Sequence, residues 1–324
     1  MRAGPRPARP RRARSGAGVS FARAGAKETG VHTSARYLVV GCGYVGLRLA
    51  RALLPRGPVV GITASEESAA RVESQGIDAC AWNLDDADAA VPRRAGTPSV
   101  VYYLVPPPTS GTMDPRVKRF LARLPAPPAR VVYVSTTGVY GDAQGAVVDE
   151  DSPLNPGTDR AARRVDAEHS VRTWCTRQGV AWTILRVPGI YGPGRLPIER
   201  LKRGEPMIRH SEAGYSSRIH VDDLVNACLL TGSAPRAAER VYNVTDGNPA
   251  SMTEYFERVA TLAGLPPPRL VTRAEAEQVL SPGLLSYLAE SRRVDSRRIR
   301  EELGFAPRFA DLRLGILSSL PAPR

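Results

Sequence analysis

The sequence predicts an α/β fold, with a doubly wound parallel sheet and a smaller C-terminal lobe. Three observations predict it. Short apolar runs alternate with amphipathic segments from Arg36 to about Val187, a glycine-rich turn follows the first apolar run, and the alternation breaks into turns after Val187. Strands separated by helices are typical of βαβ units, whose binding sites lie at the carboxyl ends of parallel strands.

The apolar runs and the amphipathic segments give the ranges of the individual elements. Short β-branched or aromatic runs predict strands, and apolar positions three or four residues apart predict helices. We expect strands at Tyr37–Val40, Val59–Thr63, Ala79–Trp82, Val100–Val105, Arg130–Ser135 and Trp182–Val187. We expect helices at Leu47–Leu54, Val117–Leu124 and Asp159–Gln178.

The turn after the first strand has glycines in the pattern G-x-G-x-x-G, with Tyr44 and Val45 between the second and the third. Gly41 permits the tight turn, Gly43 lacks a Cβ, so that a pyrophosphate can approach the backbone, and Gly46 lets the helix pack closely on the sheet. A glycine-rich turn without a ligand uses the same residues. The strand before and the helix after it favour a dinucleotide site of the Rossmann type.

The three parts of the chain differ in composition. We expect a disordered basic leader over residues 1–35, an NAD(P)-binding Rossmann domain over 36–190 and a small substrate-binding lobe over 191–324, with part of the sheet shared. The leader is rich in Arg, Ala, Pro and Gly, and its apolar content is too low to fold. An organelle transit peptide and an overlong gene start are the alternatives for this segment.

The charge of the chain is concentrated in the leader. Nine basic residues against Glu28 give residues 1–36 a net +8 of the total +13, and the remainder does not indicate nucleic-acid binding. No apolar run reaches the roughly 20 residues that cross a bilayer. The four cysteines lack paired spacing, which favours a reducing compartment. We therefore expect a cytoplasmic protein with a small-molecule substrate and without nucleic-acid or membrane partners.

Five further motifs occur in the order found in one enzyme family. From Tyr37 to about Leu314 the chain resembles the extended short-chain dehydrogenase/reductase superfamily, of the NAD-dependent epimerase/dehydratase type. The motifs are Val132–Gly141, Leu185–Gly194, Arg218–Leu224, Val241–Val244, and Ser291–Asp295 with Leu303–Pro307. The resemblance implies NAD(P) binding, with oxidoreductase or epimerase chemistry on a small polar substrate. It also implies a homodimer, as in relatives of this family.

The resemblance implies where the catalytic residues lie. Thr136 falls at the family's hydroxyl that binds the reacting oxygen, with Ser135 beside it, and backbone capping by these hydroxyls is the alternative. The family's catalytic tyrosine and lysine lie four residues apart on the helix after the fifth strand. Aligning on Pro156 and Glu168 places Arg160 at the tyrosine and Arg164 at the lysine.

Arginine changes the chemistry of that pair. Its pKa, above about 12, excludes it as a general acid or base. Arg164 could still bind ribose hydroxyls, and Arg160 offers a forked donor for a carboxylate or phosphate. The family's proton relay is therefore absent or rebuilt from other residues. Tyr103 and Tyr191 are other phenols near the cleft that could act as the acid or base instead.

The resemblance also implies the remaining cofactor contacts. Thr63 stands where an acidic residue binds the adenosine ribose of NAD, so NADP is slightly favoured over NAD. Asn83 and Leu84 resemble the segment that contacts adenine. Leu104 lies where the fourth strand meets the dinucleotide, and Pro188 belongs to the sixth-strand motif. The adjacent Asp222 and Asp223 are interpreted as helix caps, and no metal site is expected.

Two hypotheses of function follow. The first is an NAD(P)-dependent oxidoreductase or epimerase with a non-standard acid/base arrangement. Four arginines near the cleft mouth would attract an anionic substrate: Arg160, Arg186, Arg195 and Arg218. The second is a non-catalytic redox sensor or scaffold, for which the missing tyrosine and lysine are the motive.

Overall fold

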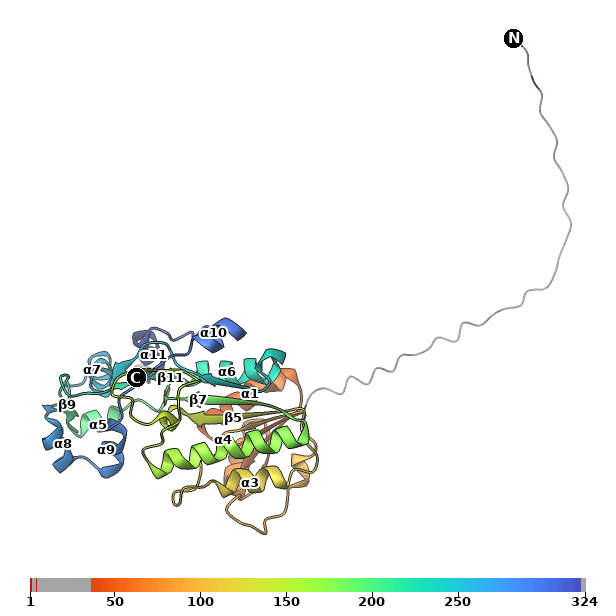
Figure 1. Cartoon of the computed structure of the whole chain (residues 1–324), viewed down its shortest axis with the longest axis horizontal. Helices are drawn as coiled ribbons and strands as arrows, with labels where there is room; N and C mark the ends of the chain where they lie inside the picture. The colour runs from red at the N-terminus through yellow and green to blue at the C-terminus, as the bar shows by residue number, and fades with distance from the viewer. Residues whose placement is uncertain (2–3, 5–35, 322–324) are drawn as a thin grey trace. The chain divides into compact units, whose positions relative to one another are not determined.

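The computed structural model describes residues 1, 4 and 36–321 (Figure 1). Apart from residues 1 and 4, the predicted leader over 1–35 lies outside the described residues. Residues 36–321 belong to one compact unit, which the following paragraphs describe. Within the described part of the chain, no helix has the length and apolar character needed to cross a membrane.

A seven-stranded parallel sheet forms the centre of this unit. From one edge to the other its strands are β12 (Arg240–Asn243), β7 (Ala181–Val187), β5 (Arg130–Thr136), β4 (Val100–Tyr103), β1 (Tyr37–Val40), β2 (Val59–Thr63) and β3 (Asp78–Ala81). The inner strands are buried on both faces, which is why they read as continuous runs of valine, isoleucine and tyrosine rather than as an alternating pattern.

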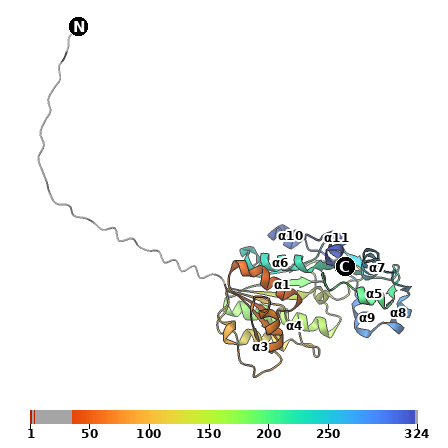
Figure 2. The same cartoon turned by 180° about the vertical axis from the view of Figure 1, so that it is seen from behind.

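Helices cover both faces of the sheet, as two opposite views show (Figures 1 and 2). One face packs against α1 (Tyr44–Leu53), α2 (Glu66–Glu73), α6 (Val221–Ser233) and α10 (Arg297–Leu303). The other face packs against α3 (Pro115–Ala122) and α4 (Asp159–Gln178). Each layer has its own apolar core, so the sheet is the middle of three layers.

A smaller group of helices and strand pairs lies beyond the carboxyl ends of the strands and has a separate apolar core. Its helices are α5 (Ile198–Lys202), α7 (Met252–Leu262), α8 (Arg273–Val279), α9 (Pro282–Leu288) and α11 (Leu312–Ser319). Its strand pairs are β8 (Gly189–Tyr191) with β11 (Arg218–His220), β9 (Met207–Ile208) with β14 (Leu270–Val271), and β10 (Tyr215–Ser216) with β13 (Ala250–Ser251). A fourth pair, β6 (Val147–Val148) with β15 (Arg293–Val294), lies near Tyr140.

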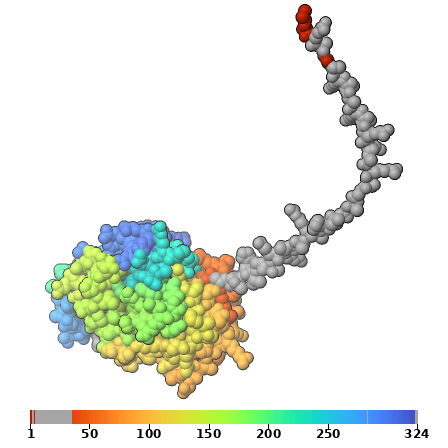
Figure 3. Space-filling model, turned by 45° about the vertical axis from the view of Figure 1, so that its right-hand side comes forward, coloured from red at the N-terminus to blue at the C-terminus, as the bar shows by residue number. Residues whose placement is uncertain are grey.

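Single turns of 3-10 helix complete the connections between these elements. They are η1 (Leu54–Arg56), η2 (Arg93–Ala95), η3 (Thr137–Tyr140) and η4 (Pro235–Ala237). The space-filling view shows the C-terminal segment, in blue, beside the cyan region of α6 (Figure 3). Asp223 of α6 accepts hydrogen bonds from the amides of Arg308 and Phe309, at 2.7 and 3.0 Å. Asp223 therefore anchors this segment and does not cap α6, whose N-cap is His220.

The predicted fold class is confirmed. Two predicted strands and one predicted helix have the observed bounds, and the others shift by one to three residues. The first helix begins at Tyr44 rather than Leu47, because it starts directly from the glycine turn. Strand β12 comes from beyond residue 190, so the chain returns to the sheet after entering the lobe.

Candidate functional site

The glycine turn between β1 and α1 is shaped by packing at two of its three glycines. Gly41 has φ +91°, and a Cβ there would stand 2.9 Å from the backbone nitrogen of Val105. A Cβ at Gly46 would stand 2.4 Å from the carbonyl oxygen of Gly41. Real Cβ atoms do not approach other heavy atoms so closely. Both positions therefore require glycine even in the absence of a ligand.

The middle glycine has no such packing reason. A Cβ at Gly43 would meet no protein atom within 4 Å, since this residue faces an open cavity. Gly43 is also the N-cap of α1, and no side chain caps the helix there. Within residues 36–321 the amides of Tyr44, Val45 and Gly46 have no acceptor. Unpaired helical amides beside an open backbone fit a bound pyrophosphate.

The cavity in front of this turn has a volume of about 780 Å³ and lies at the carboxyl ends of β1, β2, β4, β5 and β7. Its volume is in the usual range for cofactor sites. Of the residues predicted for cofactor or catalysis, eleven line it: Gly41, Gly43, Tyr44, Val45, Gly46, Thr63, Leu104, Ser135, Thr136, Arg164 and Pro188. Three predicted residues do not line it: Asn83, Leu84 and Arg160.

Asn83 and Leu84 are occupied elsewhere. The side-chain oxygen of Asn83 accepts a hydrogen bond from the amide of Asp85 at 3.0 Å and holds a local turn. The side chain of Leu84 is buried in the core under α3. These two residues therefore belong to the loop after β3 and to the core beneath it.

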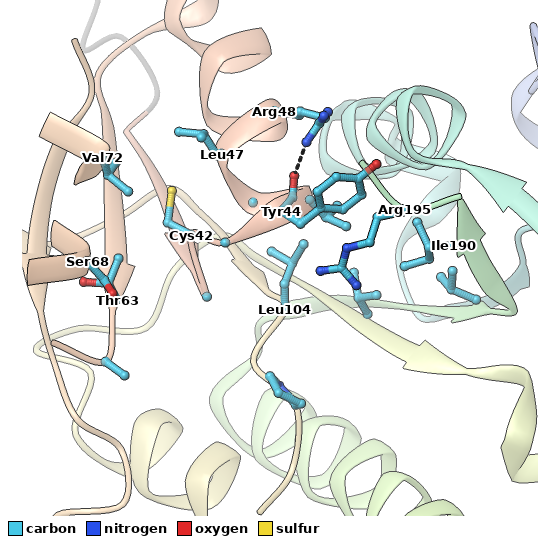
Figure 4. Close-up of a pocket in the computed structure, with 18 of the residues that line it drawn as sticks. Cys42, Tyr44, Leu47, Arg48, Thr63, Ser68, Val72, Leu104, Ile190 and Arg195 are labelled. Carbon is cyan, nitrogen blue, oxygen red and sulfur yellow. Dashed lines mark hydrogen bonds between the residues drawn. The ribbon is translucent and has the colours of Figure 1, made fainter. Parts of the chain in front are cut away.

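At one end of the cavity lie Thr63 and Ser68, and at the other end lie Ile190 and Arg195 (Figure 4). The hydroxyl of Ser65 caps α2, and the guanidinium of Arg71 donates to the hydroxyl of Ser68 at 2.8 Å. The sequence analysis missed Arg71, which lines the cavity from the second turn of α2. Its spacing of i, i+3 from Ser68 is the signal that could have found it.

Tyr44 connects the glycine turn with the loop after β8. Its ring lies between the guanidinium carbons of Arg48 and Arg195, 4.2 and 4.6 Å from the ring centre (Figure 4). Its hydroxyl donates to the carbonyl oxygen of Pro193 at 3.0 Å. Burial raises the pKa of Tyr44, while the two arginines lower it. Cation–π contacts of this kind fix the position of the loop that carries Arg195.

The two hydroxyls at the end of β5 have different partners. The hydroxyl of Ser135 donates to Glu168 at 2.6 Å in a buried position. Thr136 accepts from the amide of Gly138 at 3.2 Å, which leaves its own proton free to be donated into the cavity. Thr136 can therefore bind a ligand oxygen, whereas the proton of Ser135 is already used.

Glu168 is the centre of a buried polar network. The guanidinium of Arg186 donates to its two carboxylate oxygens at 3.2 and 2.9 Å. Arg186 also donates to the hydroxyl of Tyr140 at 2.9 Å, and Tyr140 donates to the side chain of Asn243 at 2.8 Å. Burial disfavours the charged form of Arg186, yet the ion pair raises its pKa above the ordinary value. This network joins β5, α4, β7 and β12 below the cavity.

Two of the four arginines expected at the cleft mouth are therefore interior residues. Arg186 is 3% exposed and Arg218 is 4% exposed. The expectation was wrong for Arg186 because its charge is balanced inside the protein by Glu168. Arg160 stacks on Tyr287 of α9, with 3.9 Å between its guanidinium carbon and the ring centre. Of the four, Arg195 is the one that lines the cavity.

The i, i+4 pair on α4 divides between two environments. Arg164 lines the cavity, and its Nη1 donates to the hydroxyl of Tyr133 at 3.0 Å and to the carbonyl oxygen of Val134 at 3.1 Å. Arg160 faces the lobe instead.

The two phenols expected near the cleft are both buried. Burial strongly raises the pKa of Tyr103 and raises that of Tyr191. The hydroxyls of both residues lack partners within the described chain.

Comparisons with known proteins place this geometry in a family. The model of the NAD dependent epimerase/dehydratase family matches residues 116–245. Protein YeeZ of Escherichia coli strain K12 is 28% identical over 292 residues, which cover 84% of this chain and 96% of YeeZ. These similarities support the extended short-chain dehydrogenase/reductase superfamily as the family of this chain.

Two further proteins are similar to this chain, one in sequence and one in structure. The dTDP-glucose 4,6-dehydratase of Streptomyces griseus is 29% identical over 206 residues, or 59% of this chain and 58% of that enzyme. A solved structure, that of a functionally unknown conserved protein from Silicibacter pomeroyi DSS, has a TM-score of 0.72 and 29% identity, with 88% of this chain and 97% of that chain covered.

Proposed function

We propose that the protein binds a nicotinamide dinucleotide, NADP in preference to NAD, and acts as an oxidoreductase or epimerase on a small, polar, anionic substrate. The open backbone at Gly43 carries this proposal. Packing explains the glycines on either side, whereas at Gly43 a ligand that approaches the main chain explains the missing side chain. The match to an NAD-dependent family supports a nicotinamide dinucleotide as the cofactor.

Different residues of the cavity would bind different parts of the cofactor and the substrate. The amides of Tyr44, Val45 and Gly46 would hold the pyrophosphate, and Arg164 would donate to ribose hydroxyls from the position of the family's lysine. When bound, the nicotinamide supplies hydride transfer. Thr136 would donate its hydroxyl proton to the reacting oxygen of the substrate and so orient it beside the cofactor.

Calorimetry on the full chain tests the binding step. We expect NADPH and NADH each to bind, with NADPH the tighter. If neither nucleotide binds at millimolar concentration, the proposal of a dinucleotide site is wrong. A co-purified nucleotide identified by mass spectrometry would give the same answer independently.

Arg71 gives the basis for NADP. Its guanidinium lies beside the hydroxyl of Ser68 at the start of α2, where a 2′-phosphate would reach the end of β2. We expect Arg71→Ala to weaken NADPH binding about tenfold and to leave NADH binding unchanged, because a hydrogen bond to a charged group contributes roughly 1.5–3 kcal/mol. Calorimetry with both nucleotides measures this difference.

The control for that variant is Arg177→Ala. Arg177 is an exposed residue in the last turn of α4 that does not line the cavity, and its replacement removes the same charge. Equal weakening of NADH and NADPH by Arg71→Ala would assign Arg71 to the shared part of the nucleotide and contradict the preference.

Thr136 is the residue whose loss should affect turnover. We expect Thr136→Ala to lower kcat by at least about tenfold, with little change in NADPH affinity, because the variant removes a donor to the reacting oxygen and not a cofactor contact. Thr136→Ser keeps the hydroxyl and should retain most of the turnover. A kcat that falls equally in both variants would exclude this role.

One observation favours a second candidate function, a non-catalytic sensor of the nicotinamide redox state. Within the described residues, the wall of the cavity contains no Asp, Glu, His or Lys. Its titratable groups are Cys42, whose pKa burial raises to about 12, Tyr44 and four arginines. A sensor should bind the oxidised and reduced cofactors with different affinity and show no turnover in any variant.

A further inference from the structure

A second cavity of about 430 Å³ lies next to the first, inside the lobe. Ile190 and Arg195 line both cavities, so the two cavities are neighbours along β8 and the loop that follows it. The walls of the second cavity come from β8, the loop before α5, α5 itself, the start of β11 and α7. A ligand in this cavity would therefore lie beside the proposed cofactor site.

Arg218, at the start of β11, lines this cavity and is 4% exposed. Its Nη1 donates to the carbonyl oxygen of Ala250 at 3.3 Å. Its Nη2 donates to the hydroxyl of Ser216 at 3.0 Å and to the carbonyl oxygen of Ser251 at 3.2 Å. These acceptors are all neutral, and Nε has no acceptor within residues 36–321.

The charge of Arg218 is thus buried without an ion pair. Asp246 and Glu254 act on it electrostatically, but neither forms a salt bridge with it, and their carboxylates accept from the amides of Asn248 and Ser251. Arg186 is equally buried and has Glu168 as its counter-ion. Removing a charge from water without a counter-ion is strongly unfavourable. The surroundings of Arg186 supply a counter-ion, and those of Arg218 supply only neutral acceptors.

Other polar groups of the cavity are also buried and lack a hydrogen-bond partner. Tyr255, 6% exposed, lies with its ring 4.3 Å from the guanidinium carbon of Arg218, and its hydroxyl is buried without a partner. Nη2 of Arg200 is also buried without a partner, whereas its Nε forms an ion pair with Glu205 at 2.6 Å. Arg195 adds a third positive charge, whereas the one carboxylate of the lining, Glu199, forms a salt bridge with Lys202 at 2.9 Å. The cavity is therefore positive and rich in unused donors.

We propose that this second cavity is an anion subsite centred on Arg218, which binds a carboxylate or phosphate group of the substrate. The forked guanidinium suits a planar or tetrahedral oxyanion, and Arg195, Arg200 and Tyr255 supply further donors. The inference deepens the proposed function, on which its role in substrate binding rests. The anion site itself is measured without nucleotide, so failure of one proposal leaves the other standing.

Isothermal calorimetry on the full chain, without nucleotide, tests the subsite with three probes: inorganic phosphate, inorganic pyrophosphate and malonate. We expect at least one to bind, and Arg218→Met to weaken it by tenfold or more while NADPH affinity stays unchanged. Tighter binding of phosphate or pyrophosphate than of malonate would indicate a phosphorylated substrate, and the reverse order would indicate a carboxylic acid. Absence of binding by all three at about 10 mM overturns the proposal.

The matched control is Arg258→Met. Arg258 is exposed on α7 and outside the cavity lining, so this variant removes one positive charge from the same lobe. Equal anion binding by folded Arg218→Met and Arg258→Met overturns the proposal. If Arg218→Met does not fold, the exposed Arg195→Met decides, with an expected weakening of about threefold or more. An affinity of Arg195→Met equal to that of Arg258→Met would then overturn it.

Discussion

Gly43→Ala is expected to fold like the parent protein and to lose dinucleotide binding by at least about tenfold. Its Cβ would meet no protein atom within 4 Å, so the variant has no packing penalty. The same methyl group would occupy the space through which a pyrophosphate reaches the backbone. Thermal unfolding and calorimetry with NADPH measure the two effects separately.

Gly46→Ala is the matched comparison, with the opposite result. Its Cβ would stand 2.4 Å from the carbonyl oxygen of Gly41, a backbone atom that cannot move without displacing the turn. We expect the free energy of unfolding to fall by about 3 kcal/mol, the upper part of the usual range for overpacking. If Gly43→Ala is as destabilised as Gly46→Ala, the glycine pattern is structural throughout and its use as evidence for a ligand fails.

The second large effect is expected at the buried ion pair. Glu168→Gln should lower the free energy of unfolding by about 3–5 kcal/mol, because it keeps the shape of the side chain but leaves the charge of Arg186 buried without a counter-ion. Chemical denaturation measures the change. Glu67→Gln, in an exposed ion pair with Arg71, should change stability by less than about 1 kcal/mol.

The double variant Glu168→Leu with Arg186→Met distinguishes charge from packing. Removing both charges should recover a large part of the stability lost in Glu168→Gln, since no uncompensated ion remains. The loss in the free energy of unfolding should be measured for Glu168→Leu, for Arg186→Met and for the double variant. If the double variant loses more than the two single variants together, this account is wrong and the loss comes from packing. The outcome also bears on the subsite, because Arg186 is the reference against which Arg218 is judged.

The fold could be predicted because its signals are local. The strands read as buried β-branched runs, and Gly41 and Gly46 satisfy steric requirements that act within a few residues or across one strand. The predicted bounds of α4 are the observed ones. Thr158 caps its start and Gly179 ends it in a left-handed conformation, and both residue types are typical of those positions.

The site was predictable only in part, because side-chain direction depends on tertiary contacts. Arg71 reaches the cavity through the orientation of α2, and Arg160 turns to Tyr287, a residue 127 positions later in the chain. Arg186 belongs to a motif expected near the cleft, yet its partner Glu168 holds it in the interior. No sequence spacing distinguishes a paired buried arginine from an unpaired one.

The return of the chain to the sheet has a consequence for the autonomy of its parts. Since β12 lies in sequence between two parts of the small lobe yet forms the outer edge of the sheet beside β7, no single cut separates a dinucleotide-binding piece from the remainder. A fragment ending at residue 190 would leave the hydrogen-bonding groups of β7 open, and an uncovered edge of this kind invites aggregation. We therefore expect new specificity in this architecture to be reached by changing loops in place rather than by exchanging whole domains.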